Sequence, residues 1–440
     1  MKEEFLHWLW KNRLFDESLL TSDGSCKIEI LTPGEYNRDS GPDFFNTRLI
    51  INGTEWAGNT EIHINASDWY RHGHHTDHSY DNVILHLVSN NDCETYTASG
   101  RKLVTARLAY DDVLWENYLN LVNNPTPLAC GRYASTLDMF RIRHWLNSLA
   151  VDRLEHKSNE ISEKLRKNNN DWEGTLYWLI SRYFGFRVNT DPFEQLATRL
   201  PLKVIKKHAD NLLQVESLLF GTAGMLDEAL FREAINDGYY RLLMREYSVL
   251  RTKYSLQPVE GWTWKFHRLR PANFPTIRIS QLAALLTGRH GLFSRILECT
   301  NAGQLYEILT VKASAYWNDH YIFGKKSTER TCAAGKESAD LLIINAVVPL
   351  LFVYGRAKQQ QEICERALDI LESLPPEDNS LITDYTSAGI IPDSAFTTQA
   401  LIELRTLWCR FHRCLDCHIG SSLIALGHNL DRSESLFLEP

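Results

Sequence analysis

Two β-rich runs separated by the dipeptide Asn52-Gly53 constrain the fold of this chain more than any other feature. The first run covers residues 44–51 and the second covers residues 55–64. Asn-Gly is typical of a two-residue hairpin turn, because both positions of that turn need a positive φ angle. We therefore predict an antiparallel hairpin, in which the start of the first strand lies beside the end of the second.

The remaining sequence favours an α+β protein. In the N-terminal part, a helix is predicted over 3–15 and short strands over 28–31, 83–88 and 102–109. After a linker at 123–127, helical patterns cover 138–167, 171–185, 193–219, 223–236, 239–253, 278–299, 302–312, 338–355, 358–373 and 395–411. We predict an α/β domain over 1–125 and a large mainly α-helical region over 135–440. A bundle and a solenoid are both open for that region.

Composition narrows the class of protein. The chain has 440 residues, 44% hydrophobic and 23% charged, as in an ordinary globular protein. Its 47 Lys and Arg against 55 Asp and Glu give a net charge of −8, which excludes a basic coat but not a local basic groove. No apolar run suggests a membrane span, and the polar N-terminus does not look like a secretory signal. We expect a cytoplasmic protein without a membrane partner; the oligomeric state is open.

Acidic side chains lie at the predicted open end of the hairpin. Asp43 follows the Gly41-Pro42 turn, while Glu61 and His63 stand two residues apart on the second strand and share a face. The hairpin therefore predicts that Asp43 and Glu61 are neighbours. Two carboxylates beside a third polar group can seat Mg²⁺ or Mn²⁺. The alternative is that Asp43 caps a turn and the other two face solvent.

The order of these residues resembles the PD-(D/E)xK nuclease superfamily: an early Glu35, then Pro42-Asp43 opening a hairpin, then Glu61-Ile62-His63. The resemblance covers roughly the first hundred residues and implies a restriction-endonuclease-like fold. It implies that Asp43 and Glu61 hold the metal, with Glu35 assisting through the metal or its water. His63 stands where the superfamily has Lys; imidazole can be a base or a ligand, but it is not a fixed positive charge.

Nearly the full length of the chain also resembles an uncharacterised bacterial protein family. The stretches that carry this likeness are 41–46, 56–63, 67–72, 80–86 and 268–275. This second resemblance implies no activity.

Histidines concentrate in one short region, since six of the sixteen lie between His63 and His86. His72, His74 and Asp77 are candidate ligands for Zn²⁺, Mn²⁺ or Fe²⁺, because a compact loop can turn alternate residues inward. A solvated His-rich loop is equally compatible with the pattern. His86 lies in an apolar strand and is expected to be a core histidine with its hydrogen bonds satisfied.

Cysteines gather near the C-terminus as Cys409, Cys414 and Cys417. Cys-x2-Cys is a two-point chelate, and a structural zinc would take its fourth ligand from His412, His418 or a distant thiol such as Cys130. An iron–sulfur cluster has the same thiolate demand. Resemblance to those PD-(D/E)xK nucleases that carry a [4Fe–4S] cluster implies one early Cys and three late ones. Three free thiols are the alternative.

A segment at 262–278 interleaves aromatic and basic residues. Cations could meet phosphates while aromatic rings stack on unpaired bases. The candidate nucleic-acid contacts are Lys265, His267, Arg268, Arg270 and Arg278. The alternative is that the aromatic rings are core and the cations pair with carboxylates.

The leading prediction is a metal-dependent nuclease, or a nuclease-like DNA-binding protein, that hydrolyses phosphodiester bonds. Motifs of P-loop nucleotide hydrolysis, of dinucleotide binding and of the serine-hydrolase elbow are absent from the sequence. One alternative is a non-catalytic helical scaffold with structural metal sites. Another is a metalloenzyme acting on a small molecule through Glu61, His63, His72 and His74.

Overall fold

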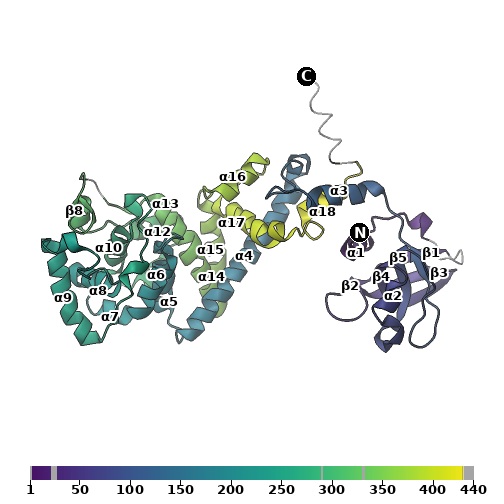
Figure 1. Cartoon of the computed structure of the whole chain (residues 1–440), viewed down its shortest axis with the longest axis horizontal. Helices are drawn as coiled ribbons and strands as arrows, with labels where there is room; N and C mark the ends of the chain where they lie inside the picture. The colour runs from purple at the N-terminus through teal and green to yellow at the C-terminus, as the bar shows by residue number, and fades with distance from the viewer. Residues whose placement is uncertain (1, 21–26, 289–290, 330–331, 429, 431–440) are drawn as a thin grey trace, which may run out of the picture. The chain divides into compact units, whose positions relative to one another are not determined.

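The structure, a computed structural model, describes residues 2–20, 27–288, 291–329, 332–428 and 430. It divides into two compact units. Unit 1 comprises Met1–Trp145, Asp384–Ile390 and Arg405–Pro440, and unit 2 comprises Leu146–Thr383 and Ile391–Leu404. A mixed sheet lies in unit 1 and helices dominate unit 2, so the predicted α+β class is confirmed (Figure 1).

The sheet of unit 1 has the order β1-β3-β4-β5-β6, with β2 paired beside β3. Its strands are β1 (Ile28–Thr32), β2 (Glu35–Tyr36), β3 (Phe44–Ile51), β4 (Thr54–Asn65), β5 (Val83–Asn90) and β6 (Thr105–Arg107). The pairs from β1 to β4 are antiparallel, whereas β4–β5 and β5–β6 are parallel. The predicted hairpin is confirmed as β3–β4, and Asn52 and Gly53 both have positive φ angles, 50° and 83°.

Helices and a short crossover cover this sheet. The amphipathic helix α1 (Glu3–Asn12) buries Phe5, Leu6 and Leu9 and packs against β4. The crossover from β4 to β5 contains α2 (Asp68–Arg71) and two 3-10 turns, His74–Thr76 and His78–Tyr80. Trp69 anchors it in a core cluster with Tyr80, Val83 and Leu103. Residues 83–88 are buried throughout, which explains why their sequence is apolar without alternation.

The chain returns to unit 1 near its C-terminus. The helix α18 (His418–Ile424) lies beside α3 (Asp112–Val122) (Figure 1). The Asn117 side chain donates to the carbonyls of Leu426 and His428 at 3.4 and 3.1 Å, and the Trp8 indole donates to Ser421 Oγ at 2.9 Å. This division differs from the domain boundaries expected from sequence. Those boundaries assigned the C-terminal part of unit 1, which we call the return segment (Arg405–Pro440), to the helical region 135–440.

Unit 2 is built from helices of ordinary length. They are α5 (Trp172–Phe184), α6 (Thr190–Arg199), α7 (Leu202–Lys206), α8 (Leu212–Thr222), α9 (Gly238–Tyr254), α10 (Pro275–Leu286), α11 (Leu292–Glu298), α12 (Ala302–Leu309), α13 (Lys336–Leu342), α14 (Val348–Lys358), α15 (Gln361–Ser373) and α17 (Ala395–Glu403). Two further helices, α4 (Met139–Lys167) and α16 (Ser380–Ser387), belong partly to each unit.

Two helical predictions were wrong in detail, and one short hairpin was missed. The segment 193–219 is three helices, because Pro201 breaks the first and Asn211 caps the third. Residues 223–236 form turns with a single 3-10 turn at Arg232–Ala234. A small hairpin of β7 (His320–Ile322) and β8 (Lys325–Lys326) was not expected in the helical region.

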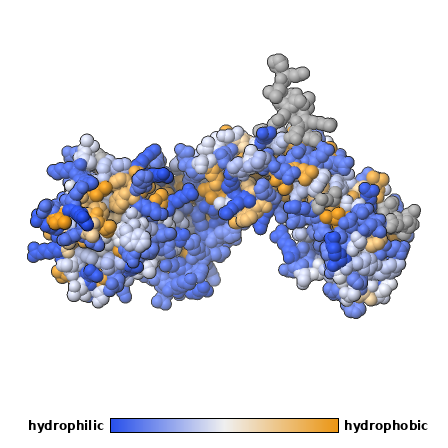
Figure 2. Space-filling model, in the orientation of Figure 1, coloured by the Kyte–Doolittle hydropathy of each residue, from blue (hydrophilic) through white to orange (hydrophobic). Residues whose placement is uncertain are grey.

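The length of one continuous helical run was also underestimated, since the sequence predicted residues 338–355. Lys336–Lys358 is the one helix in the described residues that is long and apolar enough to cross a membrane, with a mean hydropathy of 1.8. Since 78% of that apolar window is buried inside the chain, the run has the character of a core helix. The face visible in Figure 2 is mostly hydrophilic, with scattered hydrophobic patches.

Candidate metal centre

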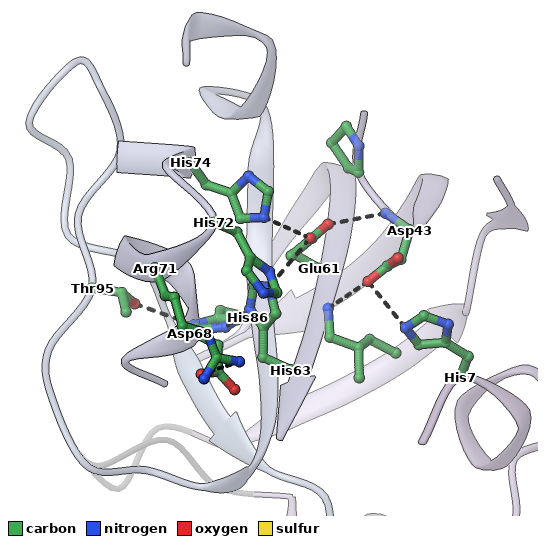
Figure 3. A network of polar contacts seen from close by, with 12 residues as sticks. His7, Asp43, Glu61, His63, Asp68, Arg71, His72, His74, His86 and Thr95 are labelled. Atoms are coloured by element: carbon green, nitrogen blue, oxygen red, sulfur yellow. Dashed lines mark hydrogen bonds and ion pairs between the residues drawn. The ribbon is translucent and has the colours of Figure 1, made fainter. Parts of the chain in front are cut away.

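The two predicted carboxylates meet at the end of the β3–β4 hairpin. Asp43 stands directly before β3, and its backbone N–H donates to Glu61 Oε2 on β4 at 3.0 Å. In return, the N–H of Ile62 donates to Asp43 Oδ2 at 2.9 Å (Figure 3). The pairing of Phe44 with Thr60 explains this reciprocal contact, because it sets Asp43 and Glu61 beside each other in the hairpin register. Both carboxylates are thus oriented by backbone donors.

Glu35 does not take the place beside the carboxylates that the sequence suggested, and His7 lies there instead. Glu35 is exposed on β2, and none of the contacts found among the described residues joins its side chain to Asp43 or Glu61. His7, from α1, instead places Nε2 at 3.3 Å from Asp43 Oδ2. Burial lowers the pKa of His7, but the hydrogen bond and charge of Asp43, together with the charges of Glu3 and Glu61, outweigh it, so the net shift is upward. The sequence analysis missed His7, since nothing in its spacing links it to a residue so far along the chain.

Three histidines converge next to Glu61. His63 comes from β4, His72 follows α2 and His74 opens the next turn (Figure 3). Their ligand nitrogens all lie within 4.8 Å of one another. His63 Nε2 is 3.1 Å from His72 Nδ1. Glu61 Oε1 lies 3.2 Å from His74 Nε2 and 3.6 Å from His63 Nε2, so this carboxylate faces Asp43 with one oxygen and the histidines with the other.

Buried groups hold these histidines in place. His86, on β5, puts Nε2 at 2.9 Å from His63 Nδ1, and its own Nδ1 is 3.3 Å from Thr95 Oγ1. As the sequence led us to expect, His86 is a core histidine with both ring nitrogens partnered. The Tyr80 ring stacks on His74 with 3.9 Å between centroids. The metal-facing edge of the cluster is therefore supported from behind by packed and hydrogen-bonded side chains.

Burial shapes the protonation of this centre. Burial, followed by the charge of Asp43, raises the pKa of Glu61 to about 9. Burial and then the neighbouring imidazoles lower the pKa of His63 to about 2, and burial lowers that of His86 to about 3. At neutral pH His63 and His86 are thus uncharged and Glu61 holds a proton. A cation bound here would displace that proton, as is usual when metal ligands must be deprotonated.

The rest of the His-rich loop faces solvent. Asp77 does not join the three histidines; its carboxylate accepts from the N–H of Ser79 at 2.8 Å and caps a 3-10 turn. Hydrogen bonds from Ser79 lower the pKa of Asp77. His78 is exposed and pairs with Asp81 at 2.8 Å. Of the three loop ligands that the sequence suggested, the structure brings His72 and His74 together and leaves Asp77 outside.

The model of a family described as "protein of unknown function (DUF2851)" matches residues 3–380. The chain belongs to this family. The matched span contains the whole candidate metal centre. No curated protein and no solved structure gives a match.

The four cysteines of this DUF2851 chain that the sequence suggested as ligands lie in unit 1. Cys130, Cys409, Cys414 and Cys417 are all free thiols. Arg405 donates to the carbonyl of Pro127, which joins the two segments that carry them. Burial, and then the charges of the other three thiols, raise the pKa of Cys130, so the four sit within electrostatic reach of one another. No three of the four sulfurs lie within 4.8 Å of one another. Cys409, Cys414 and Cys417 lie beyond the span matched by the family.

The basic segment of the DUF2851 chain lies in unit 2. Four cations of this segment are exposed and form no ion pair among the described residues: Lys265, His267, Arg268 and Arg270. The Trp262 side chain is 74% exposed, whereas the Trp264 indole is buried and donates to Ala223 O. Arg278 is only 4% exposed, and its guanidinium donates to Gln281, Asn273 and Ser338. Arg278 therefore lies inside the unit and not on its surface.

Proposed function

We propose that unit 1 is a metal-dependent phosphodiester hydrolase of restriction-endonuclease-like form, a nuclease or a nuclease-like DNA-binding protein. The observation that carries the proposal is the reciprocal contact between Asp43 and Glu61 at the open end of the β3–β4 hairpin. The order of α1 and the first strands, with an antiparallel hairpin leading into a parallel strand, also suits that superfamily.

The chemistry follows from what a divalent ion does beside two carboxylates. An ion held by Asp43 and Glu61 would lower the pKa of a bound water and neutralise charge on the phosphorane-like transition state. The backbone donors on both carboxylates keep their oxygens aimed without help from solvent. His63 has partners on both ring nitrogens and a lowered pKa, so it does not supply the positive charge of a lysine. In this proposal the ion alone activates the water, and exposed Glu35 acts at most through solvent.

Contact with the nucleic acid is proposed for the basic segment of unit 2. Lys265, His267, Arg268 and Arg270 are exposed without carboxylate partners, so their charges are available to phosphates. The exposed Trp262 ring offers a stacking surface for an unpaired base. Arg278 is left out of this surface because it is buried. Substituting Lys265 or Arg268 by Ala should reduce the salt dependence of DNA binding by about one charge each.

A soft-metal cofactor is proposed for the four cysteines. A zinc ion with Zn–S bonds of about 2.3 Å would draw its sulfurs to about 3.8 Å from each other. The thiols of an iron–sulfur cluster bind different iron atoms and stand farther apart, which suits the wider spacing seen among Cys130, Cys409, Cys414 and Cys417. Free thiols suit a reducing compartment, so we place the protein in the cytoplasm. Anaerobic purification with iron and zinc analysis tests this; absence of both metals would remove the cofactor.

A cleavage assay tests the hydrolase. Purified full-length chain is incubated with Mg²⁺, Mn²⁺ or Zn²⁺ and with single-stranded, duplex and branched DNA. Asp43→Asn and Glu61→Gln keep the oxygens that accept from the backbone, so they should fold while cleavage falls on the order of 100-fold or more. Asp77→Asn makes the same charge change on an exposed loop and should cleave normally. If the wild type cleaves no substrate with any ion, the hydrolase is excluded and the scaffold alternative is favoured.

A further inference from the structure

We infer that His63, His72, His74 and Glu61 form a binding site for a transition-metal ion of the Zn²⁺ or Fe²⁺ type, and not for Mg²⁺. This inference deepens the proposed function, on which it rests only for the reaction that the ion would assist. The claim of binding can be tested whether or not the chain cleaves DNA.

The spacing of the donor atoms is that of one small ion. A tetrahedral ion with bonds of about 2.0–2.1 Å to nitrogen and oxygen keeps its ligand atoms about 3.4 Å apart. The nitrogens of His63 and His72 are 3.1 Å apart, and Glu61 Oε1 lies 3.2 and 3.6 Å from His74 and His63. Three of the six donor–donor distances thus match those around one tetrahedral ion, and the three histidine nitrogens all lie within 4.8 Å of one another.

Hydrogen bonds behind His63 leave the correct nitrogen available. A ligating histidine usually donates its other ring N–H to a fixed acceptor, which sets its tautomer. His63 Nδ1 faces His86 Nε2 at 2.9 Å, and His86 Nδ1 faces Thr95 Oγ1 at 3.3 Å. When Thr95 accepts from His86 and His86 accepts from His63, the lone pair of His63 Nε2 points toward His72 and Glu61. This relay is a second observation, independent of the spacing.

The kind of ligand decides the kind of ion. Mg²⁺ prefers six oxygen ligands and keeps several waters, whereas imidazole nitrogens suit Zn²⁺, Fe²⁺ and their neighbours. Three imidazoles against one carboxylate oxygen therefore favour a transition metal. His72 is exposed while His63 is buried, so an ion can enter from solvent on the His72 side. A fifth coordination position on that side would admit water or a phosphate oxygen.

Metal binding by matched variants tests the site in the full-length chain. The protein is stripped with a chelator, reloaded with Zn²⁺, dialysed and analysed for metal content, and Zn²⁺ and Mg²⁺ binding are measured by calorimetry. His72→Ala and His74→Ala should each bind one equivalent of Zn²⁺ fewer than the wild type, or bind it at least about tenfold more weakly. His78→Ala, in the same loop but paired with Asp81, should match the wild type. The Cys cluster is unchanged in all three variants, so any zinc that it binds adds equally to their metal content.

The outcomes separate this inference from the hydrolase. Full zinc content in both His72→Ala and His74→Ala, with the fold verified by circular dichroism, overturns the histidine site even if Mg²⁺-dependent cleavage is observed. Equal affinity of the wild type for Mg²⁺ and Zn²⁺ at this site overturns it as well. Loss of one zinc in the two variants supports the site, even if no DNA is cleaved and the hydrolase itself fails.

Discussion

The histidine–carboxylate centre and the cysteine cluster both lie in unit 1, but they are assembled in different ways. Apart from His7, the residues of the first centre lie between Asp43 and Thr95 and are positioned by the hairpin and by strand pairing. The second cluster joins Cys130 to residues 409–417 through the return of the chain. The nitrogens of His63, His72 and His74 in the first lie within 4.8 Å of one another, whereas no three sulfurs of the second do. The first centre is therefore preorganised, and the second depends on tertiary closure.

Removing metal from the cysteine cluster should have the largest effect on stability, because that metal would join distant segments. A ligand present at 1,000 times its Kd stabilises the folded state by about 4 kcal/mol. We expect Cys417→Ser to lower the free energy of unfolding by about that amount and to remove the part of its chelator dependence that the cysteine cluster contributes. Urea denaturation followed by tryptophan fluorescence measures this. Cys364→Ser, a buried thiol of unit 2, is the control and should keep the chelator effect. Equal behaviour of the two variants would contradict a metal at the cluster.

A smaller loss of stability is expected when the contacts that hold the C-terminal residues in unit 1 are removed and every cysteine is kept. Asn117 is fully buried, donates to Leu426 and His428, and accepts from the N–H of Leu430. Asn117→Ala should lower the free energy of unfolding by about 1–3 kcal/mol, because buried backbone groups lose their partner. Hydrogen exchange of residues 418–428 should accelerate. Exposed Asn236→Ala is the control. Unchanged exchange in the Asn117 variant would show that the return segment is held by other contacts.

The smallest effect is a pH dependence at the histidine centre. The pKa of Glu61 is raised to about 9, so between pH 7 and 8 each bound ion must displace one proton. Zinc affinity should therefore rise about tenfold per pH unit in this window, or about 1.4 kcal/mol. Without metal, the stability of the folded chain changes with pH in the opposite direction from the zinc affinity. A raised carboxyl pKa favours the protonated folded form, so its contribution is lost as the pH rises from about 4.5 toward 9.

Calorimetry in buffers of different ionisation enthalpy counts the released protons. The Glu61→Gln variant has no proton to release at this position, so its zinc affinity should not change between pH 7 and 8 through this group. A wild-type affinity that does not change between pH 7 and 8 would contradict a protonated Glu61.

What could be predicted from the sequence was local. Asn52-Gly53 determines the turn and the register beside it, and a one-residue register shift between Phe44 and Thr47 then sets Asp43 beside Glu61. His72 and His74 followed from their alternation in a short loop. These inferences needed only residues close along the chain.

What could not be predicted depends on tertiary contacts. His7 reaches Asp43 from a separate helix, and His86 supports His63 across a parallel strand pair whose register no turn sets. Arg278 resembled a surface cation but is buried, because its guanidinium finds neutral side-chain acceptors inside unit 2. The break at Pro201 was readable in the sequence, but the helical periodicity on both sides outweighed it in the prediction.

The most direct measurement is a crystal structure of the zinc-loaded chain with anomalous data collected at the zinc edge. The account predicts an anomalous peak about 2.0–2.1 Å from the ligating nitrogens of His63, His72 and His74 and close to Glu61 Oε1. Anomalous peaks elsewhere in the chain, with none between these four residues, would contradict it.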